Sequence, residues 1–170
     1  FFRRKNMNAK GEARSWTDHL LWHHSAHTID IFQYMTGAKV IAANVLQGPK
    51  HPALGIAMDM SIQMKTDKGQ VLTLSLSFNN DGPFGTFFRY IGDNATYLAR
   101  YDDLYTGKDE PVDLSSVDVP SNNGIELQDR EFIAAIREGR EPNSSVAGTI
   151  DCYRVIGELA ASLEAQDGWS

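Results

Sequence analysis

Residues 58–78 read MDMSIQMKTDKGQVLTLSLSF, and their pattern decides the fold class. Apolar and polar side chains alternate on both sides of residues 66–69, whose Thr-Asp-Lys-Gly composition is typical of a turn. The alternation predicts a β-hairpin with one apolar and one polar face. Its apolar series is Met58, Met60, Ile62 and Met64 before the turn, and Leu72, Leu74, Leu76 and Phe78 after it.

Further strands are predicted on both sides of this hairpin. Residues 40–46 form one candidate, followed by the turn signal Gly48-Pro49. Residues 86–91 and 95–101 predict a second hairpin. The polar stretch 102–123 is interpreted as a linker to the helices that follow.

Helices are predicted before and after the strands. Their expected ranges are 18–35, ending at Gly37; 125–138, ending at Gly139; and a last helix after Pro142, capped by Asn143 or Ser144. Strands therefore follow one another between helices instead of alternating with them. This order predicts an α+β domain, with a largely antiparallel open sheet and helices packed on one face.

Composition bounds the function. The chain has 170 residues, enough for one domain, and its formal net charge of −6 argues against a nucleic-acid or anionic-membrane partner. No apolar run approaches the length of about 18 residues that a membrane span needs. The single cysteine, Cys152, excludes an internal disulfide and favours a reducing, cytoplasmic location.

Four of the five histidines fall within nine residues: His19, His23, His24 and His27. Buried imidazoles need polar partners, so this density favours function over packing. Two chemistries remain open. His19, His23 and His27 are spaced by four and could hold zinc, although no Glu directly follows the first His as in zinc proteases. Alternatively, His27 acts as a general base, with Asp30 one turn later either to orient its ring or to serve the helix structurally.

The sequence from His27 to Asp30 (His-Thr-Ile-Asp), with a hydrophobic helix ending in Gly37, resembles the start of the C-terminal domain in Gfo/Idh/MocA oxidoreductases. Residues 129–139 (DREFIAAIREG) and the long final helix resemble the end of that domain. The family typically shows Asp-x-x-x-His-x-x-Asp, in which the His accepts a proton. His27 matches that His, whereas His23 stands where the family commonly has its first Asp.

This resemblance implies that the chain is part of an NADP-dependent dehydrogenase. His27 would accept the substrate proton, and His23 would hydrogen-bond the substrate or tune His27 in a pocket more cationic than usual. Three longer strings, at residues 1–8, 16–24 and 75–83, resemble one member of the family that oxidises a dianionic dicarboxylate. Arg14 is the first candidate to bind the carboxylates of such a substrate, and the weaker candidates are Arg4, His24, Arg3 and Arg89. Trp16 would either wall the flat ring of the substrate or pack in the core.

No Gly-x-Gly-x-x-Gly phosphate loop occurs in the chain. Because the family keeps its nucleotide-binding domain on the N-terminal side, residues 1–170 are expected to form the substrate-binding and oligomerisation domain. NADP would then be bound mainly by a Rossmann domain outside this chain, and the fragment alone would be inactive. The resemblance also implies a homodimer formed through the open sheet face. The alternatives are a non-catalytic binding or assembly module of the same fold, and a dehydrogenase for another hydroxyl or aldehyde substrate.

Overall fold

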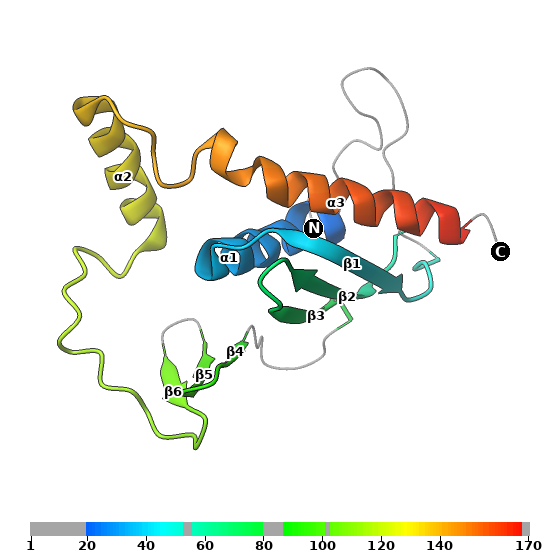
Figure 1. The fold of residues 1–170 in the computed structure, drawn as a ribbon, viewed down its shortest axis with the longest axis horizontal. Coiled ribbons are helices and arrows are strands. Elements are labelled where there is room, and N and C mark those ends of the chain that lie inside the picture. The colour runs from blue at the N-terminus through cyan, green and yellow to red at the C-terminus, as the bar shows by residue number, and fades with distance from the viewer. Residues whose placement is uncertain (1–19, 53–55, 80–86, 101–102, 168–170) are drawn as a thin grey trace. The chain divides into compact units, whose positions relative to one another are not determined.

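The computed structural model describes residues 20–52, 56–79, 87–100 and 103–167, and every structural statement below concerns these ranges. The chain divides into two compact units, Phe1–Asn79 with Asn143–Ser170, and Asn80–Pro142. Each unit contains a three-stranded antiparallel sheet (Figure 1). The predicted α+β class is confirmed, although the described strands form two small sheets instead of one.

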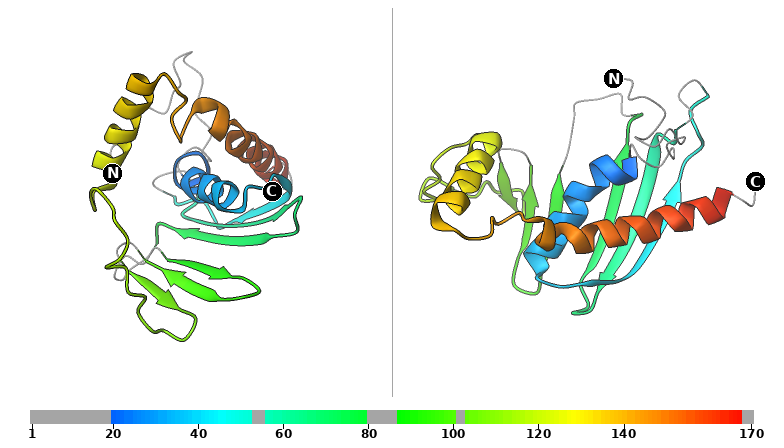
Figure 2. Two further views of the ribbon diagram at one scale, coloured as in Figure 1. Left: turned by 60° about the vertical axis from the view of Figure 1, so that its left-hand side comes forward. Right: turned by 90° about the horizontal axis from the view of Figure 1, so that it is seen from above.

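The first unit is a sheet with two helices packed on one face (Figure 2). Strands β1 (Val40–Gln47), β2 (Asp59–Thr66) and β3 (Val71–Ser77) lie in the order β1-β2-β3. Helices α1 (Ala26–Thr36) and α3 (Val146–Asp167) contribute to the same buried hydrophobic cluster as these strands. The helices therefore lie on one face, as the sequence predicted.

The hairpin of β2 and β3 has the two faces expected from its alternation. On β2, Met60, Ile62 and Met64 are buried, whereas Ser61 and Gln63 between them are exposed. The apolar side chains of β3 pack against the same core, and its Thr and Ser side chains are exposed. At the turn, Gly69 takes a φ of 90°, a left-handed conformation that glycine adopts without steric cost.

Helix α3 spans 22 residues and buries one stripe against the sheet and α1. Ile156, Leu159 and Leu163 are all within 1% of complete burial, which confirms the predicted stripe. The cap differs from the prediction. The Ser145 hydroxyl accepts the Gly148 N–H at 3.1 Å, so Ser145 caps the helix in place of Asn143 or Ser144.

The second unit contains β4 (Phe88–Ile91), β5 (Thr96–Ala99), β6 (Leu104–Thr106) and helix α2 (Gly124–Glu138). The predicted hairpin of β4 and β5 is confirmed, with Tyr90 opposite Tyr97. Strand β6 was missed because residues 102–123 were interpreted as a linker. Its three residues are too few to show an alternating pattern, and its pairing with β5 is what defines it.

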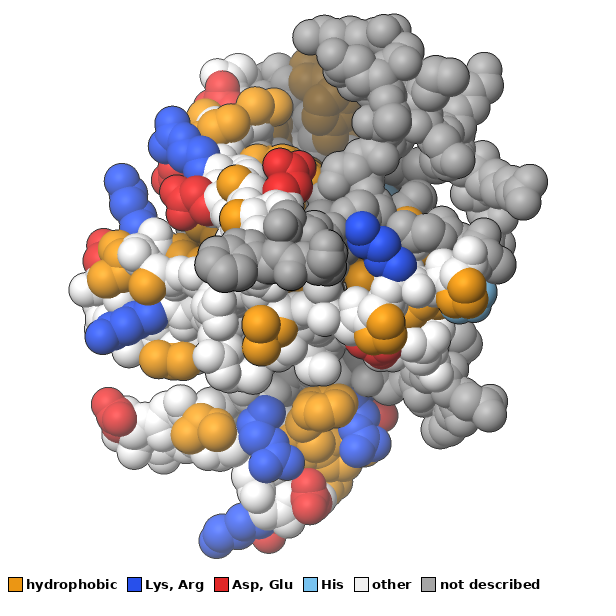
Figure 3. All heavy atoms as spheres, turned by 90° about the vertical axis from the view of Figure 1, so that its right-hand side faces the viewer, with side chains coloured by type: hydrophobic (Ala, Val, Ile, Leu, Met, Phe, Trp, Pro, Cys, Tyr) orange, Lys and Arg blue, Asp and Glu red, His pale blue; other side chains and the backbone are white. Residues whose placement is uncertain are grey.

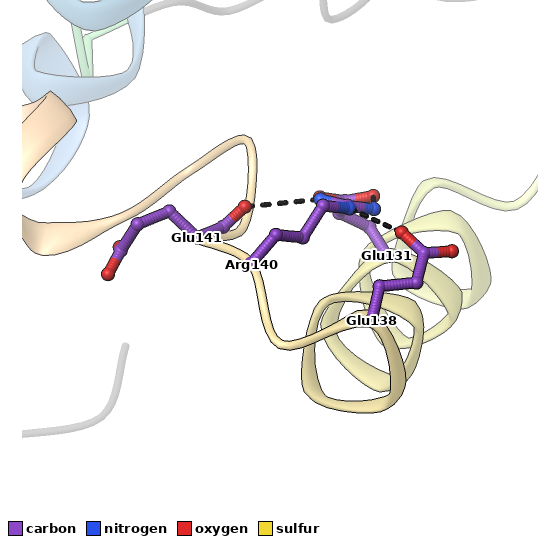
Figure 4. A network of polar contacts seen from close by, with 4 residues as sticks. All are labelled: Glu131, Glu138, Arg140 and Glu141. Carbon is purple, nitrogen blue, oxygen red and sulfur yellow. Dashed lines mark hydrogen bonds and ion pairs between the residues drawn. The ribbon is translucent and has the colours of Figure 1, made fainter.

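Both ends of α2 are capped, the C-terminal end by Gly139 as the sequence predicts. The Asn123 side chain accepts the N–H groups of Ile125 and Glu126, and Gly139 ends the helix at a φ of 63°. Beyond the end, Arg140 donates to both carboxylate oxygens of Glu131, at 2.7 and 2.9 Å (Figure 4). Arg140 also pairs with Glu138, and these carboxylates raise the pKa of its guanidinium. This paired hydrogen bonding between Arg140 and Glu131 holds the segment after α2 against the helix.

Among the described residues, no helix has the length and hydrophobicity needed to cross a membrane. On the face drawn in Figure 3, Lys and Arg side chains are interspersed with Asp and Glu side chains. The described part of this face thus carries charge of both signs.

Candidate functional site

The histidine segment begins with a π-helical turn, Leu20–Ser25, which continues into α1. A continuous α-helix over the predicted range 18–35 would put Leu20 and His23, three residues apart, on the same side. In the structure Leu20 is buried whereas His23 is exposed. The buried residues of this segment are Leu20, Leu21, Ser25, Ala26 and Ile29. The wider π turn, with i→i+5 hydrogen bonds, is a feature often found at functional sites.

The Ser25 hydroxyl gives a physical reason for the wide turn. Ser25 is completely buried, and its Oγ donates to the Leu21 carbonyl four residues earlier. In an α-helix that carbonyl would accept the Ser25 N–H. Because the hydroxyl competes for it, the α-helical pattern is weakened at this position and the wider turn is favoured.

The π turn places three imidazole rings next to one another. The ring centroids of His23 and His24 lie 4.8 Å apart, and those of His23 and His27 lie 6.4 Å apart in an edge-on arrangement. The His24 ring also meets the Phe78 ring edge-on at 4.9 Å, just beyond the end of β3. His24 therefore belongs to the cluster, although α-helical spacing had placed it about 100° away from the other rings.

A cleft of about 320 Å³ lies in the first unit beside this cluster. The π turn and α1 provide one wall, and residues from α3 and the segment before it provide the other. The lining residues are Trp22, His23, Ala26, His27, Asp30, Ser144, Thr149, Cys152 and Tyr153. The structure thus brings the two predicted catalytic histidines, His23 and His27, into one cleft.

The α3 wall of the cleft was not predicted. Thr149, Cys152 and Tyr153 follow helical i, i+3, i+4 spacing and so share one face of α3. That spacing was visible in the sequence, but nothing there indicated that this face lies opposite the histidines. The contact joins residues more than 120 positions apart, as in the hydrogen bond from Cys152 Sγ to the Ala26 carbonyl.

Asp30 lines the cleft one turn after His27, as its position predicts. The structure shows no hydrogen bond between these two described side chains, so the orienting role expected for Asp30 is not seen. Its charge instead acts on Cys152. Burial, helped by Asp30, raises the pKa of the Cys152 thiol to about 11. The thiol is therefore a neutral, buried group.

Several predicted site residues lie outside the described residues. They are Arg4, Arg14, Trp16 and His19, together with the weaker candidate Arg3. Arg89 is described and lies on β4, in the second unit. Among the described residues, no group of three or more His, Cys, Asp or Glu side chains is placed to hold a metal ion. The zinc alternative depends on His19 and stays a prediction.

A family model described as "Bacterial oxidoreductases, C-terminal" matches residues 1–118. The chain belongs to this family. The resemblance to Gfo/Idh/MocA oxidoreductases is thereby confirmed, and the fold described above is that of an oxidoreductase C-terminal domain.

One curated relative of this oxidoreductase C-terminal domain is 4-carboxy-2-hydroxymuconate-6-semialdehyde dehydrogenase from Sphingobium sp. (strain SYK-6). The two are 75% identical over 166 residues, which is 98% of this chain and 52% of the relative. The chain thus spans about half the length of the curated relative that it matches.

Solved structures share the fold at low sequence identity. UDP-N-acetylglucosamine 3-dehydrogenase GnnA from Acidithiobacillus ferrooxidans superposes with a TM-score of 0.72 at 17% identity, over 86% of this chain and 47% of that one. A putative NADPH-dependent oxidoreductase from Desulfitobacterium hafniense also gives 0.72, at 16% identity, over 89% of this chain and 50% of that one. At such identities the likeness concerns the fold alone.

Proposed function

We propose that this chain is the substrate-side half of an NADP-dependent dehydrogenase. Its substrate would be the cyclic hemiacetal of 4-carboxy-2-hydroxymuconate-6-semialdehyde, oxidised to 2-pyrone-4,6-dicarboxylate in the protocatechuate 4,5-cleavage pathway. The observation that carries the proposal is the 75% identity to the curated dehydrogenase across 98% of this chain. The adjoining His23 and His27 in one cleft supply chemistry that suits it.

The proposed oxidation removes a hydride from the carbinol carbon and a proton from its hydroxyl, which leaves the lactone carbonyl. NADP, when bound, would accept this hydride. His27 takes the hydroxyl proton, because its imidazole is exposed in the cleft and a neutral ring nitrogen can accept it. His23, in edge-on contact with His27, hydrogen-bonds the substrate or supports the charge that His27 gains.

The residues of this chain do not fit the phosphates of a dinucleotide. Such phosphates bind at a glycine-rich turn between a parallel strand and a helix. The described strands pair antiparallel, and the sequence contains no Gly-x-Gly-x-x-Gly motif. We therefore assign nucleotide binding to the half of the full-length relative that this chain does not span, and residues 1–170 to substrate binding and assembly.

The substrate would carry two carboxylates, so cationic partners are required. His23 and His24 are described candidates, and both are exposed. Arg14, Arg4 and Trp16 remain proposed substrate-binding residues outside the described ranges. Guanidinium groups would bind the carboxylates with paired donors, while His27 acts at the carbinol.

We further propose a homodimer formed through the open face of β1, β2 and β3. This face carries Ser and Thr side chains, yet Leu46 and Val71 on it are 60% and 68% exposed. A second copy would cover these two side chains. A cytoplasmic location suits the buried, unbridged Cys152.

The test uses the full-length protein and follows NADPH formation with the cyclic hemiacetal as substrate. His27→Asn should lower kcat by about 10²–10⁴-fold, since one positioned general base contributes that much. Tyr34→Ala is the matched control, because Tyr34 lies on the same helix, is 75% exposed and does not line the cleft. NADP affinity should stay unchanged in both variants. If the protein oxidises a different alcohol but not the hemiacetal, the proposed substrate is refuted. If it oxidises no hydroxyl compound, the non-catalytic module is favoured.

A further inference from the structure

Two aromatic rings from distant parts of the chain meet in the cleft. Trp22 in the π turn and Tyr153 on α3 have nearly parallel rings, with centroids 6.4 Å apart and an interplanar angle of 18°. Trp22 is half-buried, which fixes its ring, whereas Tyr153 is 46% exposed. The pair therefore offers the cleft a supported aromatic surface that is still open to a ligand.

Two polar groups on the α3 wall use their protons elsewhere. The Thr149 hydroxyl donates to the carbonyls of Ser145 and Val146, at 3.2 and 3.3 Å. The Cys152 thiol donates to the carbonyl of Ala26 at 3.4 Å. Neither group has a second proton to give to a carboxylate. Thr149 and Cys152 therefore contribute contact area to the wall, whereas Tyr153 contributes its ring face.

The stacked pair joins the two walls, because Tyr153 lies on α3 whereas Trp22 lies on the same wall as the imidazoles of His23 and His27. That wall also carries the Asp30 carboxylate. The rings can stack on a flat ligand, and the adjoining imidazoles can bind anions and exchange protons. A ligand suited to both is a flat, unsaturated ring whose edge carboxylates point toward the imidazoles. The volume of about 320 Å³ is at the lower end of the range for small-molecule pockets, which suits a single ring.

We infer that Trp22 and Tyr153 form the stacking surface of the substrate site, and that Tyr153 selects planar ring dicarboxylates over open-chain ones. The inference rests on the proposed function and deepens it. It adds two residues, Trp22 and Tyr153, to those proposed from the sequence. Because neither touches the transferred proton, they are specificity residues that act through substrate binding.

The experiment measures binding by calorimetry in the full-length protein without turnover. The probes are 2-pyrone-4,6-dicarboxylate, which is planar, and glutarate, an open-chain dicarboxylate. Tyr153→Leu should weaken the planar probe by about three- to tenfold, the usual worth of one aromatic contact, and leave glutarate within twofold. Tyr153→Phe keeps the ring and should bind both probes as the wild type does. Tyr34→Leu, outside the cleft, is the matched control.

Kinetics give a second readout. Tyr153→Leu should raise KM for the cyclic substrate while kcat changes by less than about threefold, because the stacking is equal in ground and transition states. If circular dichroism shows that Tyr153→Leu is misfolded, binding of the two probes to Trp22→Leu and Tyr153→Phe tests the inference instead.

The inference is overturned if Tyr153→Leu and Trp22→Leu both bind the planar probe normally. It is also overturned if planar and open-chain probes weaken equally, or if the wild type binds no planar dicarboxylate. Failure of the proposed function has a different signature: the wild type does not oxidise the hemiacetal, whatever the binding data show.

Discussion

The imidazole rings of His23 and His27 stand edge to face, with centroids 6.4 Å apart and planes at 80°. His23 belongs to the π turn and His27 to α1, so the contact spans the change from one helical geometry to the other. The relative position of the two rings therefore depends on the width of that turn.

This contact predicts that the two histidines act as a unit. In a double-mutant cycle of His23→Asn and His27→Asn, the effects on kcat/KM should be non-additive by at least about 0.5 kcal/mol. The physical reason is that each substitution removes the ring that the other histidine contacts. Steady-state kinetics of the four proteins measure the coupling, and strictly additive effects would show that the rings work independently.

Ser25→Ala should disturb both stability and activity. Removing the buried hydroxyl leaves the Leu21 carbonyl without that donor, which should lower the free energy of unfolding by about 1–2 kcal/mol. The turn would also be free to relax toward α-helical geometry, which would change the relative position of the His23 and His27 rings and lower kcat. Thermal unfolding and steady-state assays check this against Ser61→Ala, whose side chain is exposed on β2. Equal behaviour of the two variants would contradict our account of the turn.

Cys152 should resist thiol reagents in the folded protein. It is 1% exposed and its thiol pKa is raised from 9.0 to about 11, so at pH 8 labelling should require unfolding. Because Cys152 is the single cysteine of the chain, the labelled fraction reports on this site alone. Rapid labelling under native conditions would show that the region between α1 and α3 opens.

The same shift predicts a pH dependence of stability. Between pH 9 and 11 the unfolded thiol ionises while the folded one stays protonated, so the unfolded state binds fewer protons and stability falls as pH rises. The stability of the wild type relative to Cys152→Ala should decrease over this interval by on the order of 1–2 kcal/mol. Urea unfolding at several pH values measures the difference, and a constant difference would contradict the shift.

Two isoleucines on α3 provide a matched test of the core. Ile156 is completely buried, whereas Ile150 is 44% exposed on the same helix. Ile156→Ala should lower the free energy of unfolding by about 2–5 kcal/mol through lost burial and a new cavity. Ile150→Ala should cost less than about 1 kcal/mol. Comparable losses measured by urea unfolding would place Ile150 in a buried contact.

Much of the fold could be predicted because its signals are local. The alternation in β2 and β3 sets their two faces within a few residues, and Gly37, Asn123 and Gly139 act on the helix ends beside them. Strand β6 had no such signal. It exists through its pairing with β5, and three residues are too few for a period to show.

The sequence alone therefore determined the α+β class, the bounds of most elements and the choice of His23 and His27 as candidate catalytic residues. The tertiary structure decided which residues share the cleft with them. Thr149 and Tyr153 reach it because the apolar stripe of α3 packs beside α1, which leaves the adjoining face of α3 toward the histidines. Periodicity records which face of a helix is buried, but the partner of that face depends on contacts between residues more than a hundred positions apart.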